Sequence, residues 1–298
     1  MDYRILGKSD LQISEISFGC MSLGTDHIEN SQLLHEAVAN GINYFDTADI
    51  YQKGFNEITV GRAFKDRRDK VIIATKVGNV WKADGGGLDW KPSKAHILKS
   101  IDESLQRLQT DYIDLYQLHG GTINDPIDDT IEAFETLKQL GKIRHYGISS
   151  IRPNVIREYV KRSNIVSVMM QYSLLDRRPE EACLELLHEH DIGVLVRGSL
   201  GGGLLANKPP KSYLNYSEKE VAEAVRVVKL VANNKRLTSD VALRFVLDHL
   251  AVTSVVVGMR TMNQLNDSLE TLKNQPLSAV EYRQLQNAIQ INTYADHR

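Results

Sequence analysis

Cysteine is scarce in this sequence: the 298 residues contain two, Cys20 and Cys183. They lie far apart and form no Cys-x-x-Cys pair, so nothing indicates a disulfide framework or a zinc site made of thiolates. We therefore expect no bound metal. A chain with so few thiols fits a reducing compartment, and we expect a cytoplasmic protein.

An excess of charge of one sign and long hydrophobic runs are also absent. Lys and Arg total 36 against 38 Asp and Glu, which gives a net charge of −2. This balance does not supply the positive footprint that a phosphate backbone needs, so no nucleic-acid partner is expected. The first residues, MDYRILGKSD, lack the apolar core of a signal peptide, and the longest apolar stretch, around Val255–Val257, is too short to span a bilayer. We expect a soluble protein with no membrane partner.

Short apolar runs recur along the chain and predict eight strands. They are Ile16–Phe18, Tyr44–Phe45, Val71–Ala74, Ile113–Leu118, Tyr146–Ile148, Val166–Met170, Gly193–Val196 and Ser254–Val257. Stretches with helical spacing separate them, such as Ile97, Ile101, Leu105 and Leu108, so strand and helix alternate.

Length leaves two architectures open. At roughly 150 residues per domain the chain suggests two domains, yet a closed α/β barrel of about 250 residues is a common single-domain exception. Eight strand–helix units without a linker favour the barrel over an open two-domain sheet. Since hydrophobic residues make up 42% of the chain, a large core is available. The sequence therefore predicts an α/β fold, a single (β/α)8 TIM barrel domain over residues 1–298.

Residues with strong preferences for helix ends support this reading. The expected starts and stops are Ser31 as a cap, Asn40-Gly41 as an end, Pro92-Ser93 as a start, Gly141 as an end and Pro179-Glu180-Glu181 as a start.

Three segments exceed a minimal connection. Turn signals in Tyr3–Ser14 predict a short N-terminal hairpin that closes the barrel floor. Val77–Lys91, which contains Trp81 and Trp90, and Leu200–Ser217 are expected as extended loops at the C-terminal face. Long loops in a compact barrel are usually lids or walls of a site.

Reactive side chains in such a barrel project from the C-terminal strand ends. Asp46 ends the second strand, Lys76 the third and His119 the fourth, while Tyr51 follows Asp46 in the same loop. A phenol has an unperturbed pKa near 10, and an adjacent ammonium held by a carboxylate would favour the phenolate. An imidazole beside them can donate to a substrate oxygen. The four together could polarise a carbonyl and protonate it.

This set supplies no hydride, so a cofactor is needed. The glycine-rich segment Arg197–Gly203 follows the seventh strand, where backbone amides could hold a pyrophosphate. Arg260 precedes a helical pattern, where a cation and a helix N-terminus could meet a phosphate.

Each of these residues also has an ordinary structural explanation. Asp46 could cap a helix, His119 could belong to a loop, Lys76 could be a solvated lysine and Tyr51 could pack against the barrel lip. Glycine runs are often flexible connectors. The combination of four complementary groups at consecutive strand ends is what favours a catalytic site.

The chain resembles the aldo-keto reductases over essentially its whole length. The segments that carry the resemblance are SFGCMSLG (17–24), FDTADIY (45–51), ATKVG (74–78), DYIDLYQLHG (111–120), GKIRHYGISS (141–150), QYSLLDR (171–177), SLGGGLL (199–205) and VVVGMR (255–260). The resemblance implies a barrel that reduces aldehydes or ketones to alcohols, with NADPH favoured over NADH as hydride donor. It implies an acid/base role for Tyr51, supporting roles for Lys76 and Asp46, and an oxygen-orienting role for His119.

The same resemblance implies a set of cofactor-binding residues from the nicotinamide to the adenosine end. They are Gly19, Cys20, Met21, Asp46, Ser149, Ser150, Gln171, Arg197, Gly198, Ser199, Leu200, Gly202, Leu204, Gly258, Arg260, Gln264, Asp267 and Ser268.

Three of these positions depart from the family pattern. Ser150 stands where many members have an asparagine, Arg197 where many stack a tyrosine on the nicotinamide, and Ser268 where an asparagine binds adenine. A guanidinium can stack on an aromatic ring, although Arg197 would then set a cation against the oxidised nicotinamide.

Three function classes follow. The first is an NADPH-dependent carbonyl reductase with a small-molecule substrate, expected as a monomer. The second is a non-catalytic nicotinamide-binding regulatory or interaction subunit on the same barrel, which the intact acid/base set disfavours. The third is a metal-dependent hydrolase using Asp46 and His119, which would need further ligands where Lys76 and Tyr51 stand.

Overall fold

A computed structural model describes residues 1–298, and its centre is a closed barrel of eight parallel strands. Around the barrel the strands follow the order β10-β11-β12-β3-β4-β5-β8-β9. Their bounds are β3 Ile16–Gly19, β4 Tyr44–Asp46, β5 Ile72–Val77, β8 Ile113–Leu118, β9 Ile143–Ser149, β10 Ser167–Gln171, β11 Gly193–Arg197 and β12 Val252–Gly258. All eight predicted strands are present, and the predicted TIM barrel is confirmed.

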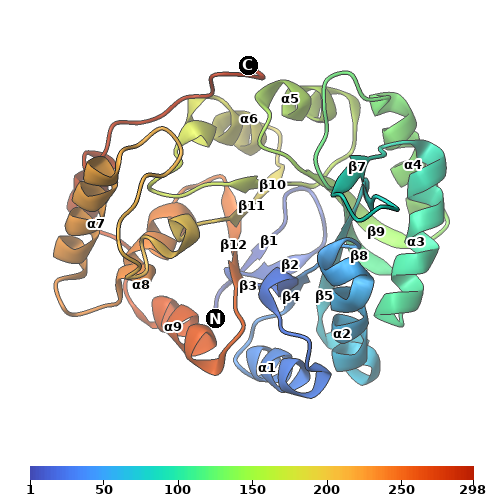
Figure 1. Ribbon diagram of the computed structural model, residues 1–298, viewed down its shortest axis with the longest axis horizontal. Helices are drawn as coiled ribbons and strands as arrows, with labels where there is room; N and C mark the ends of the chain where they lie inside the picture. Colours follow the sequence, from blue (N-terminus) through green and yellow to red (C-terminus); the bar gives the residue numbers. More distant parts are fainter.

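Helices form an outer ring around these strands (Figure 1). They are α1 His27–Ala39, α2 Phe55–Phe64, α3 Lys94–Leu108, α4 Ile127–Gln139, α5 Pro153–Arg162, α6 Cys183–Glu189, α7 Glu218–Ala232, α8 Thr238–Leu247, α9 Met262–Lys273 and α10 Ala279–Gln286. Their apolar residues recur at helical spacing and turn inward, as Ile97, Ile101 and Leu108 of α3 do. None of the helices is both long enough and apolar enough to cross a bilayer.

Most predicted helix ends agree with the structure, and one is wrong. α1 is capped by Asp26, whose carboxylate accepts hydrogen bonds from the backbone N–H groups of Ile28 and Glu29 at 2.8 and 3.1 Å. Ser31, the expected cap, lies inside α1, because Asp26 already caps the helix five residues earlier. Pro179 begins a short 3₁₀ helix over Arg178–Glu181, and α6 begins only at Cys183.

The predicted N-terminal hairpin closes the barrel floor. β1 (Tyr3–Ile5) and β2 (Gln12–Ser14) pair antiparallel and lie across the centre of the ring in Figure 1. Leu6, Leu11 and Ile13 are buried against the side chains that fill the lower barrel. Gly7 has φ +54°, and a side chain there would come within 2.3 Å of a backbone oxygen of the neighbouring strand segment, so this turn requires glycine.

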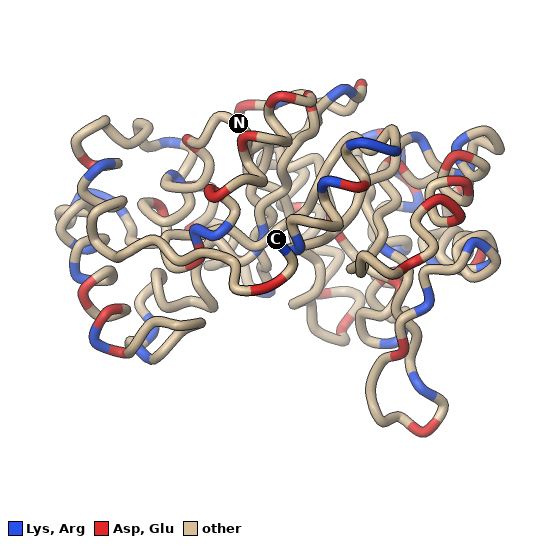
Figure 2. The backbone as a smooth tube through the Cα atoms, turned by 90° about the horizontal axis from the view of Figure 1, so that it is seen from above, with Lys and Arg blue, Asp and Glu red and all other residues tan.

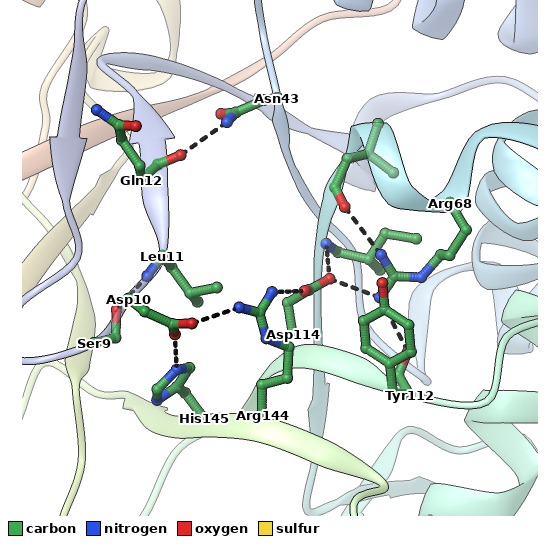
Figure 3. Close-up of polar contacts among 12 residues, drawn as sticks. Ser9, Asp10, Leu11, Gln12, Asn43, Arg68, Tyr112, Asp114, Arg144 and His145 are labelled. Atoms are coloured by element: carbon green, nitrogen blue, oxygen red, sulfur yellow. Dashed lines mark hydrogen bonds and ion pairs between the residues drawn. The ribbon is translucent and has the colours of Figure 1, made fainter.

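An ion-pair network joins this hairpin to the barrel strands β8 and β9 (Figure 3). The Asp10 carboxylate contacts His145 at 2.6 Å and Arg144 at 2.8 Å, and these hydrogen bonds lower the pKa of Asp10. Arg144 also contacts buried Asp114 at 2.8 Å, and Asp114 contacts Arg68 at 2.6 Å. The floor is therefore held by polar contacts as well as by packing, which leaves the opposite end of the barrel for a site.

Extended loops stand at that C-terminal end, as predicted. Within residues 77–91 the chain forms the antiparallel pair β6 (Asn79–Trp81) and β7 (Leu88–Trp90). The other long loop contains a short 3₁₀ helix, Gly201–Gly203. Acidic and basic residues are interspersed along the backbone (Figure 2).

Candidate active site

Parallel strand ends bring the four predicted chemical groups to one mouth. Asp46 is the last residue of β4, Lys76 lies one residue before the end of β5, and His119 directly follows β8. Tyr51 begins the short 3₁₀ helix Tyr51–Gly54 that leads into α2. All of the strands run in one direction, so their C-terminal ends open onto the same face.

Lys76 and Asp46 form a buried ion pair at the base of this mouth. Their side chains are 1% and 6% exposed, and Lys76 Nζ donates to Asp46 Oδ1 and, at 2.7 Å, to the carbonyl oxygen of Thr47. Gln117 Nε2 donates to the second Asp46 oxygen at 3.2 Å. Burial lowers the pKa of Lys76, but the charges of Asp46 and Tyr51 and the hydrogen bonds to both together outweigh burial and raise it. Lys76 therefore stays an ammonium.

The same ammonium reaches the phenol. Lys76 Nζ lies 3.4 Å from Tyr51 Oη and 5.1 Å from the centre of the Tyr51 ring. The chain after Tyr51 turns sharply, because Gln52 and Lys53 have φ values of 50° and 56°, a conformation uncommon outside glycine. Gln52 Nε2 fixes this turn by donating to the carbonyl oxygen of Leu23 at 2.7 Å.

His119 completes the group as a neutral imidazole. Its ring meets the Tyr51 ring edge-on, with centroids 5.9 Å apart. Burial, and then the charges of Lys76 and Arg197, lower the pKa of His119 to about 3. Its Nδ1 is buried without a hydrogen-bond partner in the protein. A neutral imidazole carries one N–H donor, which can serve a substrate oxygen.

We expect this lowered pKa to give His119 a pH signature in stability. The unfolded chain binds a proton at His119 near pH 6.5, whereas the folded chain binds it near 3, so the free energy of unfolding falls as the pH drops from 6.5 towards 3. Urea unfolding of wild type and His119→Gln between pH 7 and 4 measures the difference, which should shrink with acid. The exposed His188→Gln variant is the control. An unchanged difference across this range would contradict a neutral His119.

A cavity of about 600 Å³ opens above these groups. The residues that line it are Met21, Ile50, Tyr51, Lys76, Asn79, Trp90, His119, Gly120, Gly121, Thr122, Ser149, Ser150, Ile151, Arg152, Met169 and Arg197. Trp90 from the 77–91 loop therefore forms part of the wall. Trp81 is 40% exposed and does not line it.

The residues expected around a nicotinamide differ in their exposure to this cavity. Ser149 and Ser150 line the cavity, and so does Met21, whose side chain is 65% exposed. Cys20 is fully buried and does not line the cavity, and it directly follows Gly19, the last residue of β3.

Gln171 is held in one orientation by its neighbours. Its Nε2 donates to Asp176 at 2.9 Å and to the Tyr213 hydroxyl at 3.0 Å, while its Oε1 accepts a hydrogen bond from Arg197 at 3.0 Å. Arg197 is thus tied to Gln171 at the cavity edge. The Gln171 carbonyl oxygen keeps a second lone pair for a carboxamide N–H.

The glycine-rich segment after β11 exposes backbone. Gly198, Gly201, Gly202 and Gly203 all have positive φ, and a Cβ at Gly202 would meet nothing within 4 Å. Such a turn presents backbone N–H groups to an anion. The other expected residues, Ser199, Leu200 and Leu204, lie in the same segment, and Ser199 and Leu204 are buried, at 2% and 1% exposure.

A second cavity of about 460 Å³ lies between residues 22–33 and 260–262. Arg260 lines it, next to Gly258 at the end of β12, and its backbone N–H donates to Gln264 Oε1 at 2.9 Å. Asp267 is exposed on α9. Ser268 is 5% exposed and donates to the carbonyl oxygen of Gln264 at 2.8 Å, so this serine is occupied within the helix.

Several residues of the site were not found by sequence reasoning. Gln117 steadies Asp46, and the Asn79 side chain donates to the backbone oxygen of His119 at 2.8 Å. Arg152 lines the cavity, and Lys208 donates to the carbonyl oxygen of Gly202 at 2.9 Å. Of these residues, only Lys208 had a signal in the sequence: it is a lysine shortly after the glycine run, where a cation could bind a phosphate.

The fold and this site define a class, and comparison with known proteins agrees. A model of the aldo/keto reductase family matches residues 15–290. The chain therefore belongs to the aldo/keto reductase family and is an NAD(P)H-dependent oxidoreductase that acts on small carbonyl compounds.

Particular relatives lie close in sequence and structure. The chain is 50% identical over 307 residues to the uncharacterized oxidoreductase YqkF of Bacillus subtilis, with 100% of both chains covered. It superposes on the holo form of the aldo-keto reductase AKR11C1 from Bacillus halodurans with a TM-score of 0.94 and 50% identity, covering 100% of this chain and 99% of that one. The NADH-specific methylglyoxal reductase of Escherichia coli is 28% identical, covering 90% of this chain and 92% of that protein.

Proposed function

We propose that this protein reduces an aldehyde or ketone to an alcohol with NADPH and that Tyr51 is the general acid. One observation carries the proposal: the buried Lys76 ammonium, held by Asp46 and Thr47, lies 3.4 Å from the Tyr51 hydroxyl in a cavity that His119 also lines. A phenol beside a fixed cation can release its proton, because the cation stabilises the phenolate that remains.

The chain's own residues would then divide the reaction as follows. His119 donates a hydrogen bond to the carbonyl oxygen and orients it. A reduced nicotinamide, when bound, would supply the hydride that the carbonyl carbon needs. Tyr51 transfers its phenolic proton to the oxygen, which gives the alcohol, and Lys76 stabilises the phenolate until solvent returns a proton. Asp46 holds Lys76 in position throughout.

The geometry also supports binding positions for the successive parts of the cofactor. Ser149 and Gln171 suit a carboxamide, because both present polar groups at the cavity or its edge. The open backbone around Gly202, with Lys208 beside it, suits a pyrophosphate. Arg260, at the second cavity and just before α9, suits a phosphate on the adenosine.

The purified protein, mixed with NADPH and a panel of aldehydes and ketones, tests this function. We expect the absorbance of NADPH to fall with at least one carbonyl substrate. If NADPH binds tightly but no substrate consumes it, the non-catalytic subunit is the better description. The metal-dependent hydrolase lacks support, because no three His, Cys, Asp or Glu side chains gather to hold an ion.

Arg260→Ala should weaken NADPH binding about ten- to a hundredfold. A charge-assisted hydrogen bond of roughly 1.5–3 kcal/mol would be lost, and only NADPH carries the 2′-phosphate that accepts it. Fluorescence titration with NADPH and NADH measures both affinities, and Arg283→Ala, an exposed arginine on α10, is the matched control. Equal weakening of NADPH and NADH would mean that Arg260 does not read the 2′-phosphate. Binding to NADH is worth testing here because one family relative is named as NADH-specific.

A further inference from the structure

The wall of the larger cavity has an unusual charge balance. Its sixteen lining residues include three cations, Lys76, Arg152 and Arg197, and no aspartate or glutamate. Two of these cations are engaged, because Lys76 pairs with Asp46 and Arg197 donates to Gln171. Arg152 is left as the cation whose role the reductase chemistry does not explain.

Arg152 has most of its hydrogen-bonding capacity free. Its guanidinium makes one hydrogen bond within the protein, from Nη1 to the carbonyl oxygen of Gly121, and it forms no ion pair. A guanidinium carries five N–H donors arranged to bind a planar oxyanion. The hydrogen bond to Gly121, two residues beyond His119, holds the guanidinium on the His119 side of the cavity.

The surroundings of Arg152 do not neutralise it. The carboxylate beside the Gly121 loop, Asp125, is occupied by the Trp90 indole N–H at 3.0 Å and by the backbone N–H and hydroxyl of Thr122 at 2.7 and 2.6 Å. Arg152 itself precedes the first residue of α5, whose N-terminus has no side-chain cap. The positive end of that helix dipole therefore adds to the charge of the guanidinium.

We propose that Arg152 binds an oxyanion on the substrate, so that this enzyme prefers carbonyl compounds that carry a carboxylate or a phosphate. The inference rests on the proposed reductase function and names the substrate class of that site. An unpaired guanidinium in a concave, partly enclosed cavity attracts an anion more strongly than an exposed one would. The substrate's carbonyl then lies at Tyr51 and His119 while its anionic end lies at Arg152.

Matched substrates test the preference. 4-Carboxybenzaldehyde and methyl 4-formylbenzoate share the reacting aldehyde and differ in the charge at the far end of the ring. We expect wild-type kcat/KM to be at least about tenfold higher for the acid. Glyceraldehyde 3-phosphate against glyceraldehyde forms the second arm, and the pair with the larger ratio identifies the source of the oxyanion.

The Arg152→Gln variant tests the residue. We expect its KM for the favoured anionic substrate to rise about ten- to a hundredfold, with kcat and the kinetics of the neutral partner almost unchanged. Arg152→Lys keeps the charge without the planar fork and should recover part of the loss. Arg157→Gln removes an exposed arginine from the same helix, outside the cavity, and should change neither substrate.

The outcomes separate this inference from the function on which it rests. Equal kcat/KM for charged and neutral partners, or equal losses for both in Arg152→Gln, would overturn the anion preference while leaving the reductase intact. Absence of NADPH oxidation with every carbonyl compound would instead remove the reductase function itself. Retained activity of Arg152→Gln on the neutral ester shows that the variant is folded.

Discussion

Tyr51→Phe is expected to lower kcat for carbonyl reduction about a thousandfold. The substitution removes one oxygen, the atom that lies 3.4 Å from Lys76 Nζ at the cavity. Proton transfer by a positioned side chain contributes typically 10²- to 10⁴-fold, and no other phenol lines this cavity to replace Tyr51. Steady-state and single-turnover oxidation of NADPH measure the loss.

Cofactor binding should survive this change. Phenylalanine keeps the aromatic ring, so its edge-on contact with His119 and the local packing can persist. Fluorescence titration should therefore give an NADPH affinity within about threefold of wild type. Tyr112→Phe, on a tyrosine outside the cavity, serves as the control. Near wild-type turnover in Tyr51→Phe would assign the proton to another group.

Lys76→Met should damage both stability and turnover. The variant leaves the Asp46 carboxylate buried without its cation, and breaking a buried pair in this way costs about 3–5 kcal/mol of unfolding free energy. It also removes the ammonium proposed to stabilise the Tyr51 phenolate, so we expect kcat to fall even where the variant is folded. Urea unfolding and single-turnover rates measure the two effects separately.

A double variant distinguishes charge from packing in this result. Asp46→Leu/Lys76→Met removes both charges and keeps apolar volume, so it should recover much of the lost stability without recovering activity. Two neighbours then lose a partner, since Gln117 Nε2 donates to Asp46 and the Thr47 carbonyl oxygen accepts from Lys76. If the double variant is as unstable as the sum of the two single variants, the pair is not coupled as its geometry indicates.

The strands could be predicted closely because each is a short segment rich in apolar residues, with all of its residues adjacent in the sequence. Ile113–Leu118 was predicted with its observed bounds, and it is buried along its whole length. Helix starts were harder. Ser31 has the chemistry of a cap, yet Asp26 captures the N–H groups of Ile28 and Glu29, and a choice between two capable caps depends on backbone angles that the sequence does not display.

The gathering of Asp46, Tyr51, Lys76 and His119 followed from strand ends, because a parallel barrel sends every such end to one face. The contacts that these side chains make could not be predicted from the positions of the strand ends. Gln117 faces Asp46 across 71 positions of sequence, and Arg197, whose role the sequence left open, donates to Gln171. Side-chain directions of this kind depend on rotamers and on neighbours contributed by other strands.

The sequence by itself determined the barrel and the mouth at which the four candidate groups gather. These follow from local periodicity and from the position of each residue relative to the end of its own strand. Only the tertiary structure decided that Lys76 is an ion-paired ammonium, that the His119 imidazole stays neutral, and that Arg152 stands unpaired in a cavity without acids. The protonation state of a side chain depends on its burial and on the charges around it. Both are set by residues that are distant in the sequence and that only folding brings together.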